Sequence, residues 1–396
     1  MVQYRFIDSD THISEPADVW TARLPAKWRD QGPHVRWVAA DPAKGQRAGQ
    51  YWFLGDQQSF PVGLTTSAGW GKPFPSCPMT YEEMHPASWQ IEPRLAYMDS
   101  IGCWAQVLYP NIGGFGNQFF LKLGDPALML ACVQAFNDFQ QDWTAIAPDR
   151  FVTPIAVPFW DIDATVKEVE RCAGEGFRTV LFTMAPQDFG QPYIGDRRWD
   201  RLWSVAQEAG LPISFHIGTG DMGDMFSAAR VGAHGMAPTY AYSSSVLFLN
   251  NGIQLADLLL SGVLPRFPDL KFVSVESGIG WIPFVLETVD YQSVQVNLAA
   301  ERPEFKLKPS DYFRRQVYGC YWFEKQLDQV ALDAIGTDNI LFETDFPHPT
   351  SLYAEEVART IDTGIGRADP VLRRKVLIDN AAKLYRLKVP EQAVAA

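Results

Sequence analysis

Residues 7 to 16 read "IDSDTHISEP" and carry an apolar strand pattern into a run of polar side chains. Asp10 and His12 are two positions apart, so on an extended strand both side chains point to the same face. Asp8 shares that parity one step earlier, where it would support the other two, and Glu15 follows just beyond the strand. Buried carboxylate and imidazole groups are costly unless they pair or bind a cation. The stretch predicts a first strand that ends in a functional site.

Seven further apolar runs alternate with longer amphipathic segments, and this alternation is typical of parallel βαβ units. The eight expected strands are 4–12, 105–110, 151–158, 178–184, 212–218, 271–278, 316–322 and 339–347, and the expected helices include 125–147, 161–174, 197–209 and 324–335. We therefore expect the α/β class and a closed (β/α)8 TIM barrel. An open doubly wound sheet would need a glycine-rich phosphate-binding turn after the first strand, where "DTHISEP" stands instead.

Two long insertions are expected, one after strand 1 (residues 14–90) and one after strand 5 (residues 219–245), within a single domain over residues 1–388 and before a flexible tail at 389–396. Loops at the carboxyl ends of barrel strands build lids and pockets. The first insertion is rich in aromatic residues, which either favour a ring-containing substrate or simply pack against one another. These are Trp52, Phe53, Trp70, Phe74, Tyr81 and Trp89.

Composition limits the partners of this chain. A formal net charge of −12 over 396 residues argues against nucleic acid, which requires concentrated lysine and arginine. The apolar runs are too short to cross a membrane. The cysteines are scattered and the first residues lack a signal-peptide pattern, so we expect a cytoplasmic protein with reduced thiols. Barrels of this size often self-associate, so we expect a homo-oligomer, such as a dimer, or pairing with a related barrel subunit.

Further polar residues stand at the ends of later strands. His216 ends "ISFHIG", Glu276 ends "FVSVESG", and "ILFETDFP" contains Asp345, with His348 just after it. In a closed barrel these ends meet at one mouth, together with Asp10 and His12. Mixed imidazole and carboxylate groups there would repel one another or stay unsatisfied without a cation, and they suit Zn, Fe or Mn.

The other three histidines lie outside strand ends. His34 and His85 stand in loops without this context, and we expect them to be structural. His234 lies in the glycine-rich segment that follows the strand of His216, so it could fold over the mouth.

The order of these motifs resembles the amidohydrolase superfamily. The closest similarity is to its amidohydrolase 2 branch, which includes aminocarboxymuconate-semialdehyde decarboxylase-like and resorcylate decarboxylase-like enzymes. The most specific segment is "GTDNILFETDFPHP" at 336–349. The resemblance implies metal ligation by Asp10, His12, His216 and Asp345. It departs at "SVESGIGW" (274–281), where Glu276 replaces the catalytic histidine of the decarboxylase members.

The resemblance and the residues together suggest an enzyme that activates a water or a substrate oxygen on a divalent metal. It would hydrolyse or decarboxylate a small, apolar or ring-containing organic acid or amide, with Asp345 and then Glu276 as acid–base candidates. No other cofactor is expected. The extra potential ligands raise a second possibility, a dinuclear iron or iron–manganese monooxygenase, and a non-catalytic partner subunit is a third. Ligands for a second ion would come from Glu15, His234, Glu276 and His348.

Overall fold

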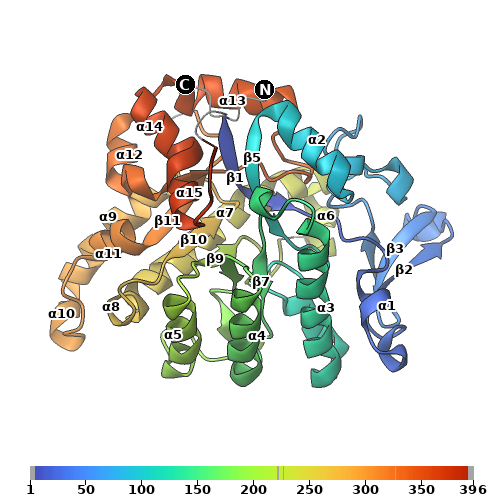
Figure 1. The fold of residues 1–396 in the computed structure, drawn as a ribbon, viewed down its shortest axis with the longest axis horizontal. Coiled ribbons are helices and arrows are strands. Elements are labelled where there is room, and N and C mark those ends of the chain that lie inside the picture. Colours follow the sequence, from blue (N-terminus) through green and yellow to red (C-terminus); the bar gives the residue numbers. More distant parts are fainter. Residues whose placement is uncertain (1–4, 221–222, 226, 326, 391–396) are drawn as a thin grey trace.

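A computed structural model describes residues 5–220, 223–225, 227–325 and 327–390 (Figure 1). The end of the expected flexible tail, residues 391–396, lies outside this described part. Within it, no helix combines the length and the apolar character that crossing a membrane would require.

Parallel strands form the centre of the molecule. They are β1 (Phe6–His12), β5 (Cys103–Tyr109), β6 (Phe151–Val152), β7 (Pro154–Ala156), β8 (Thr179–Leu181), β9 (Ile213–His216), β10 (Phe272–Val275), β11 (Val317–Tyr321) and β12 (Ile340–Phe342). One sheet has the order β1-β5-β6 and a second has the order β12-β11-β10-β9-β8-β7. Only Thr153 separates β6 from β7, and Thr11 pairs in parallel with Phe346 just beyond β12. The result is a TIM-barrel-like α/β fold.

Helices surround these strands (Figure 1). Their bounds are α1 (Val19–Arg23), α2 (Ile91–Ile101), α3 (Pro126–Thr144), α4 (Ile162–Gly174), α5 (Asp200–Glu208), α6 (Ala228–His234), α7 (Met236–Leu260), α8 (Val263–Arg266), α9 (Ile282–Gln295), α10 (Leu298–Glu301), α11 (Pro309–Gln316), α12 (Gln329–Ile335), α13 (Glu355–Thr363), α14 (Pro370–Arg374) and α15 (Asn380–Leu384). Local sequence fixes several starts: the carboxylates of Asp125 and Asp161 accept the first free N–H groups of α3 and α4.

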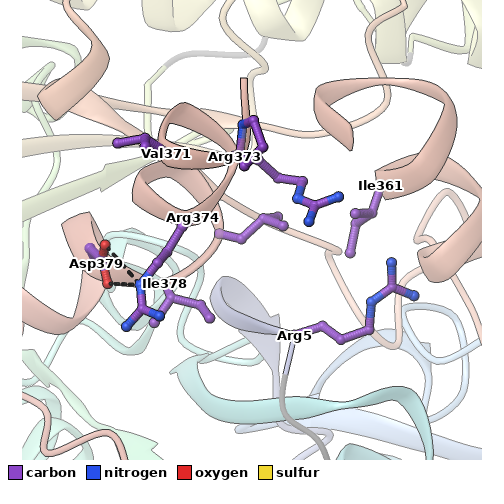
Figure 2. A pocket seen from close by; sticks show the side chains of 9 residues that line it. Arg5, Ile361, Val371, Arg373, Arg374, Ile378 and Asp379 are labelled. Carbon is purple, nitrogen blue, oxygen red and sulfur yellow. Dashed lines mark hydrogen bonds and ion pairs between the residues drawn. The ribbon is translucent and has the colours of Figure 1, made fainter. Parts of the chain in front are cut away.

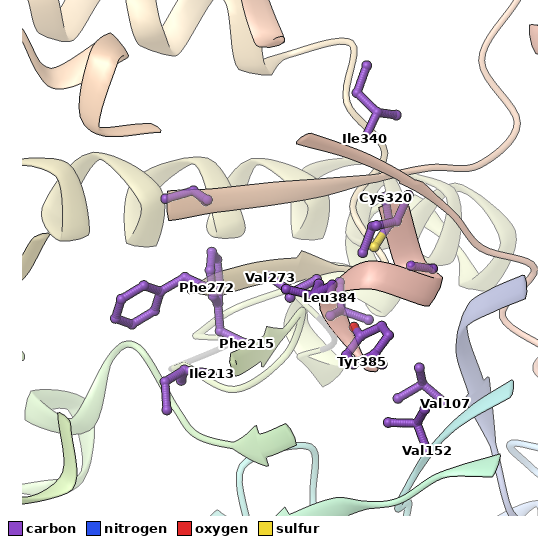
Figure 3. Packing of buried hydrophobic residues seen from close by; sticks show 14 of the residues in the cluster. Val107, Val152, Ile213, Phe215, Phe272, Val273, Cys320, Ile340, Leu384 and Tyr385 are labelled. Carbon is purple, nitrogen blue, oxygen red and sulfur yellow. The ribbon is translucent and has the colours of Figure 1, made fainter. Parts of the chain in front are cut away.

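The core consists of the side chains that the strands and the covering helices bury together. Figure 3 shows Val107 and Val152 on one side of Tyr385, and Phe215 and Val273 on the other. All of these side chains are fully buried. This packing holds the strands in place, so that their carboxyl ends form a rigid platform for polar groups.

The segments expected as loop-rich insertions contain regular structure. Residues 14–90 include an antiparallel sheet of order β2-β3-β4, with β2 at Pro33–Val38, β3 at Gly49–Leu54 and β4 at Gln57–Pro61. Residues 219–245 include α6 and the start of α7. Trp52 is buried with its ring edge-on to Trp20, at a centroid distance of 5.6 Å, and Tyr81 is buried in the same cluster. For these two aromatic residues, internal packing is the observed role.

A cavity of about 480 Å³ opens at the amino end of β1. Figure 2 shows the side chains of Arg5, Arg373 and Ile361 around it, with Arg374 paired to Asp379. Arg5 directly precedes β1, whereas His12 ends it. This cavity therefore lies at the opposite end of the strand from the polar cluster.

Candidate metal centre

Side chains from four parallel strands meet at their carboxyl ends. Asp10 and His12 lie in β1, His216 ends β9, Glu276 directly follows β10, and Asp345 follows β12. All five are buried. The same-face prediction for Asp10 and His12 is confirmed, because Asp10 Oδ1 lies 3.5 Å from Nε2 of His12.

One group of donor atoms comes from Asp10, His12, His216 and Glu276, with one ligand atom of each within 4.8 Å of the others. His216 Nε2 lies 3.5 Å from Asp10 Oδ1 and 3.0 Å from Glu276 Oε2. Apart from the Nε2 atoms of His12 and His216, both Asp10 oxygens and Glu276 Oε2 lack hydrogen-bond partners among the described residues. Buried oxygen atoms of this kind are costly unless they meet positive charge.

The two histidines of this group present their Nε2 atoms to each other. Nδ1 of His12 donates to the Pro110 carbonyl at 3.2 Å, and Nδ1 of His216 donates to the Ile217 carbonyl at 3.0 Å. These carbonyls can only accept, so they fix the Nδ1–H tautomer. The Nε2 atoms then face each other at 3.2 Å. Two lone pairs cannot face each other there without a cation between or beside them, either a proton or a metal ion.

A second group of donor atoms shares His12 and Glu276 and adds Asp345 and His348. Asp345 Oδ1 lies 3.5 Å from His12 Nε2 and 2.7 Å from His348 Nδ1. The His348 ring stacks on the His12 ring at a centroid distance of 3.7 Å. Imidazole and carboxylate donors in one buried site are a set that could hold a divalent metal.

Asn111 fixes the orientation of His348. Its side-chain N–H donates to the Ile13 carbonyl at 2.8 Å, which leaves its Oδ1 to accept from His348 Nε2 at 2.8 Å. His348 Nδ1 is then an acceptor, and the Asp345 carboxyl group beside it is the donor. The metal-free site therefore keeps a proton on Asp345, shared with His348.

Two carboxylates that follow strands have strained backbones. Glu276 and Asp345 have positive φ values of 56° and 62°, which side chains other than glycine rarely adopt. Hydrogen bonds hold both: the Glu276 N–H donates to Glu343 Oε2 at 2.9 Å, and the Asp345 N–H donates to the Asp10 carbonyl at 2.9 Å. Asp8 accepts from the N–H and the hydroxyl of Thr344, which gives it the supporting place that its parity predicted.

Burial dominates the ionisation of this site. It raises the pKa of Asp10, and it raises that of Asp345 well above its ordinary value, with repulsion from Glu276 adding to the effect. Burial opposes a charge on His216, but the Glu276 and Asp10 carboxylates outweigh it and raise the pKa of His216 to about 10. Burial also lowers the pKa of His348 to about 4. In the absence of a metal, protons therefore supply the positive charge that the donor atoms need.

Two residues expected near a second ion lie outside both groups. His234 is exposed at the end of α6, because that helix carries it to the surface instead of folding it over the mouth. Glu15 is buried, but its Oε1 accepts from the N–H groups of Asn111 and Ile112 at 2.7 and 3.0 Å. Glu15 thus anchors the loop that holds His348. His34 and His85, expected to be structural, are also absent from both groups.

Sequence reasoning missed several residues of this site. The half-buried Phe115 places its ring 4.2 Å from that of His216 and 5.1 Å from that of His12, measured between centroids, and forms an apolar wall. Glu343 is buried beside Glu276, and "FETD" offered a signal for it, since its carboxylate interrupts an apolar strand. Arg94 is buried and donates to the His12 carbonyl at 2.5 Å. Phe115 and Asn111 stand in a loop with no periodic signal.

Comparison with known proteins agrees with this architecture. The chain is 28% identical over 262 residues to gamma-resorcylate decarboxylase from Polaromonas sp. JS666, which covers 63% of this chain and 75% of that one. An amidohydrolase structure from Mycobacterium avium subsp. paratuberculosis matches with a TM-score of 0.73 and 25% identity, over 97% of this chain and 100% of that one. A dihydroxybenzoic acid decarboxylase structure from Polaromonas sp. JS666, with bound manganese and 2-nitroresorcinol, matches with a TM-score of 0.63 and 20% identity over 98% and 99%.

These relatives include carbon–carbon lyases, and their fold is that of the present chain. The family model described as Amidohydrolase matches residues 7–387, which include every residue of the polar cluster. The chain therefore belongs to the Amidohydrolase family.

Proposed function

We propose that this protein is a metal-dependent lyase that removes the carboxyl group of a small aromatic acid as CO2. The observation that carries the proposal is the pair of facing Nε2 atoms, 3.2 Å apart, among carboxylate oxygens that have no hydrogen-bond partner apart from these nitrogens. The decarboxylase relatives support the reaction class. The scaffold would be a closed (β/α)8 barrel with insertions after its first and fifth strands, in one domain over residues 1–388.

Asp10, His12, His216 and Asp345 would hold the ion. Such an ion, when bound, supplies positive charge that draws the substrate carboxylate and a neighbouring oxygen into the site and stabilises negative charge there. Fixed Nδ1 hydrogen bonds keep His12 and His216 ready to ligate without reorientation.

Asp345 is the proposed proton donor. It would deliver its proton to the ring carbon that bears the carboxylate, after which the carbon–carbon bond breaks, its electron pair returns to the ring, and CO2 leaves. His348, 2.7 Å from Asp345 Oδ1, holds that proton in place and can help to return it. Glu276 is the second candidate for acid–base work, at the position where decarboxylase members of the branch carry a histidine. The Phe115 ring would pack against the substrate ring.

A second candidate function rests on a specific observation. The two donor groups together contain Asp10, His12, His216, Glu276, Asp345 and His348, which is more than one ion needs. A pair of ions, one with Asp10, His12 and His216 and one with Glu276 and His348, would suit an oxygen-dependent hydroxylase of the iron or iron–manganese type. Asp345 could bridge them.

Metal analysis and anaerobic turnover distinguish these candidates. Protein expressed with manganese, iron and zinc available should bind one ion per chain and should release CO2 from a panel of hydroxybenzoates, beginning with 2,6-dihydroxybenzoate, without oxygen. Asp345→Asn should lower the rate by about 10²- to 10⁴-fold. His216→Asn should lose metal, whereas the exposed His234→Asn is the matched control and should not.

Two other results would reject the lyase. Nearly two ions per chain that include iron, with substrate-dependent oxygen consumption, would favour the hydroxylase. Unchanged metal content and cellular function in His216→Asn would favour a non-catalytic subunit.

A further inference from the structure

The outer surface of α7 carries an apolar stripe that is largely exposed; within the described residues, the Arg230 guanidinium of α6 lies 4.2 Å from the centroid of one of its rings, that of Tyr242. Tyr242, Leu249, Ile253 and Leu260 are 44%, 54%, 71% and 38% exposed. Val246 and Ala256 fill the intervening positions and are partly exposed. We call these six residues the α7 seam.

The spacing within the α7 seam is that of a coiled coil. Its positions alternate in steps of four and three residues from 242 to 260, which is the a/d pattern of a heptad repeat. β-Branched Val246 and Ile253 occupy a positions, and Leu249 occupies a d position, the arrangement that favours two strands. A helix that only covers a barrel directs this stripe inward, whereas here the inward face is a separate set that includes Asn251, Leu255 and Leu258.

The charge content of α7 also fits a covered surface. Asp257 is the only charged side chain in its 25 residues, although much of the helix faces outward. By contrast, the 13 residues of α4 include five charged side chains. Depletion of charge together with exposed aliphatic and aromatic side chains is the signature of an interface core.

The neighbouring helix widens this patch. Gly252 of α7 lies close to α9: a Cβ added there would be 3.4 Å from the Trp281 ring and 3.8 Å from Val285, so α9 packs directly beside the seam. Phe284 and Tyr291 of α9 are 72% and 61% exposed. With roughly 100 Å² for each large exposed side chain, the patch reaches roughly 600 Å², most of the roughly 800 Å² that each partner contributes to a stable interface.

We propose that the α7 seam binds the α7 seam of a second copy of this chain, with the exposed rings of α9 at the margin. None of the six seam side chains is charged, so the seam from Val246 to Leu260 offers no ion pair to a charged partner. Its heptad spacing is complementary to that of a second copy. A two-fold pair would bury the same residues on both copies.

Mass measurement of the full chain in solution tests the proposal. Sedimentation at micromolar concentration should give about twice the 44.4 kDa of one chain. The double variant Leu249→Glu/Ile253→Glu should weaken association by at least about 30-fold. Ile146→Glu is the matched control: this isoleucine is 60% exposed, lies just beyond the end of α3, and should leave the mass unchanged.

A second variant keeps the test independent of folding. Ile253→Val should retain the wild-type mass. Thermal unfolding should show that the double variant Leu249→Glu/Ile253→Glu and the control Ile146→Glu both fold. A monomeric wild-type chain, including one that associates only with a related barrel subunit, would overturn the proposal. So would a folded double variant that keeps the wild-type mass.

Discussion

The buried Glu15 carboxyl group, which anchors the loop that holds His348, makes the stability of the fold depend on pH. Burial raises the pKa of its carboxyl group from 4.5 to about 7, although the N–H groups of Asn111 and Ile112 oppose the shift. The folded protein therefore binds more protons than the unfolded chain between these values, so the free energy of unfolding falls as pH rises through that window. The amide oxygen of a Glu15→Gln variant can still accept both bonds, but the amide does not titrate. Between pH 4.5 and 8 we therefore expect the free energy of unfolding of the metal-free variant to rise by about 2–3 kcal/mol relative to that of the wild type.

Urea unfolding at several pH values measures this difference. Glu287→Gln, at an exposed position of α9, is the control and should track the wild type. A Glu15→Gln curve parallel to that of the wild type would show that Glu15 does not titrate between the two values.

Single residues were predictable where the backbone determines their direction. Asp10 and His12 share strand parity, and the position of His216 and Asp345 at strand ends brings them to the same platform. Glu15 was not predictable in this way, because it lies beyond the strand, where parity no longer applies, and its partners are N–H groups far along the chain. His234 was expected over the mouth because a glycine-rich segment looks like a loop, yet α6 forms there.

The turn after β10 decides where Glu276 points. Glu324 holds it from outside, since its Oε1 accepts from the N–H groups of Ile279 and Gly280 at 2.5 and 3.1 Å. Gly278 has a φ of 63°, and a Cβ there would lie 2.4 Å from the same oxygen. We expect Gly278→Ala to displace Glu324, to cost about 1–3 kcal/mol of stability, and to lower activity because Glu276 moves with the turn.

Gly280→Ala provides a control two residues away. A Cβ at Gly280 meets its nearest atoms at 3.9 Å, which is ordinary contact, so stability should change by less than about 0.5 kcal/mol. Equal effects of the two substitutions on stability and activity would contradict this account of the turn.

At the scale of elements, periodicity predicted strands and amphipathic helices alike, since the expected helices 125–147, 161–174, 197–209 and 324–335 contain α3, α4, α5 and α12. The expected runs 105–110, 271–278 and 316–322 each contain or overlap an observed strand, because buried parallel strands read as short apolar runs. The 25 residues of α7 were not predicted as a helix. Apolar residues lie on both its inward and its outward face, so the helix lacks the one-sided pattern that marks a surface helix.

The whole molecule places several acids at the end of its parallel strands, so its stability depends on what neutralises them. Burial raises the pKa of Asp8 to about 8 and raises that of Glu343 well above its ordinary value, while neighbouring carboxylates raise that of His216 to about 10 against the effect of burial. Each of these shifts makes the metal-free fold lose stability as pH rises from 6.5 to 8, because the folded state holds protons that the unfolded chain has released.

A bound divalent ion reverses that trend, because it competes with protons for the same oxygen and nitrogen atoms. We expect chelation to lower the melting temperature, and the gap between metal-loaded and chelated protein to widen from pH 6.5 to 8. At a free metal concentration of about 100 times Kd, the ion should add about 2.7 kcal/mol to the free energy of unfolding. Below pH 6.5 the trend should weaken, since burial lowers the pKa values of His12 and His348 and low pH then favours the unfolded chain. Calorimetry of His216→Asn and of the control His234→Asn completes the test. His216→Asn should lose the difference in melting temperature between metal-loaded and chelated protein, and His234→Asn should keep it. A difference that survives in both variants would place the ion away from these strand ends.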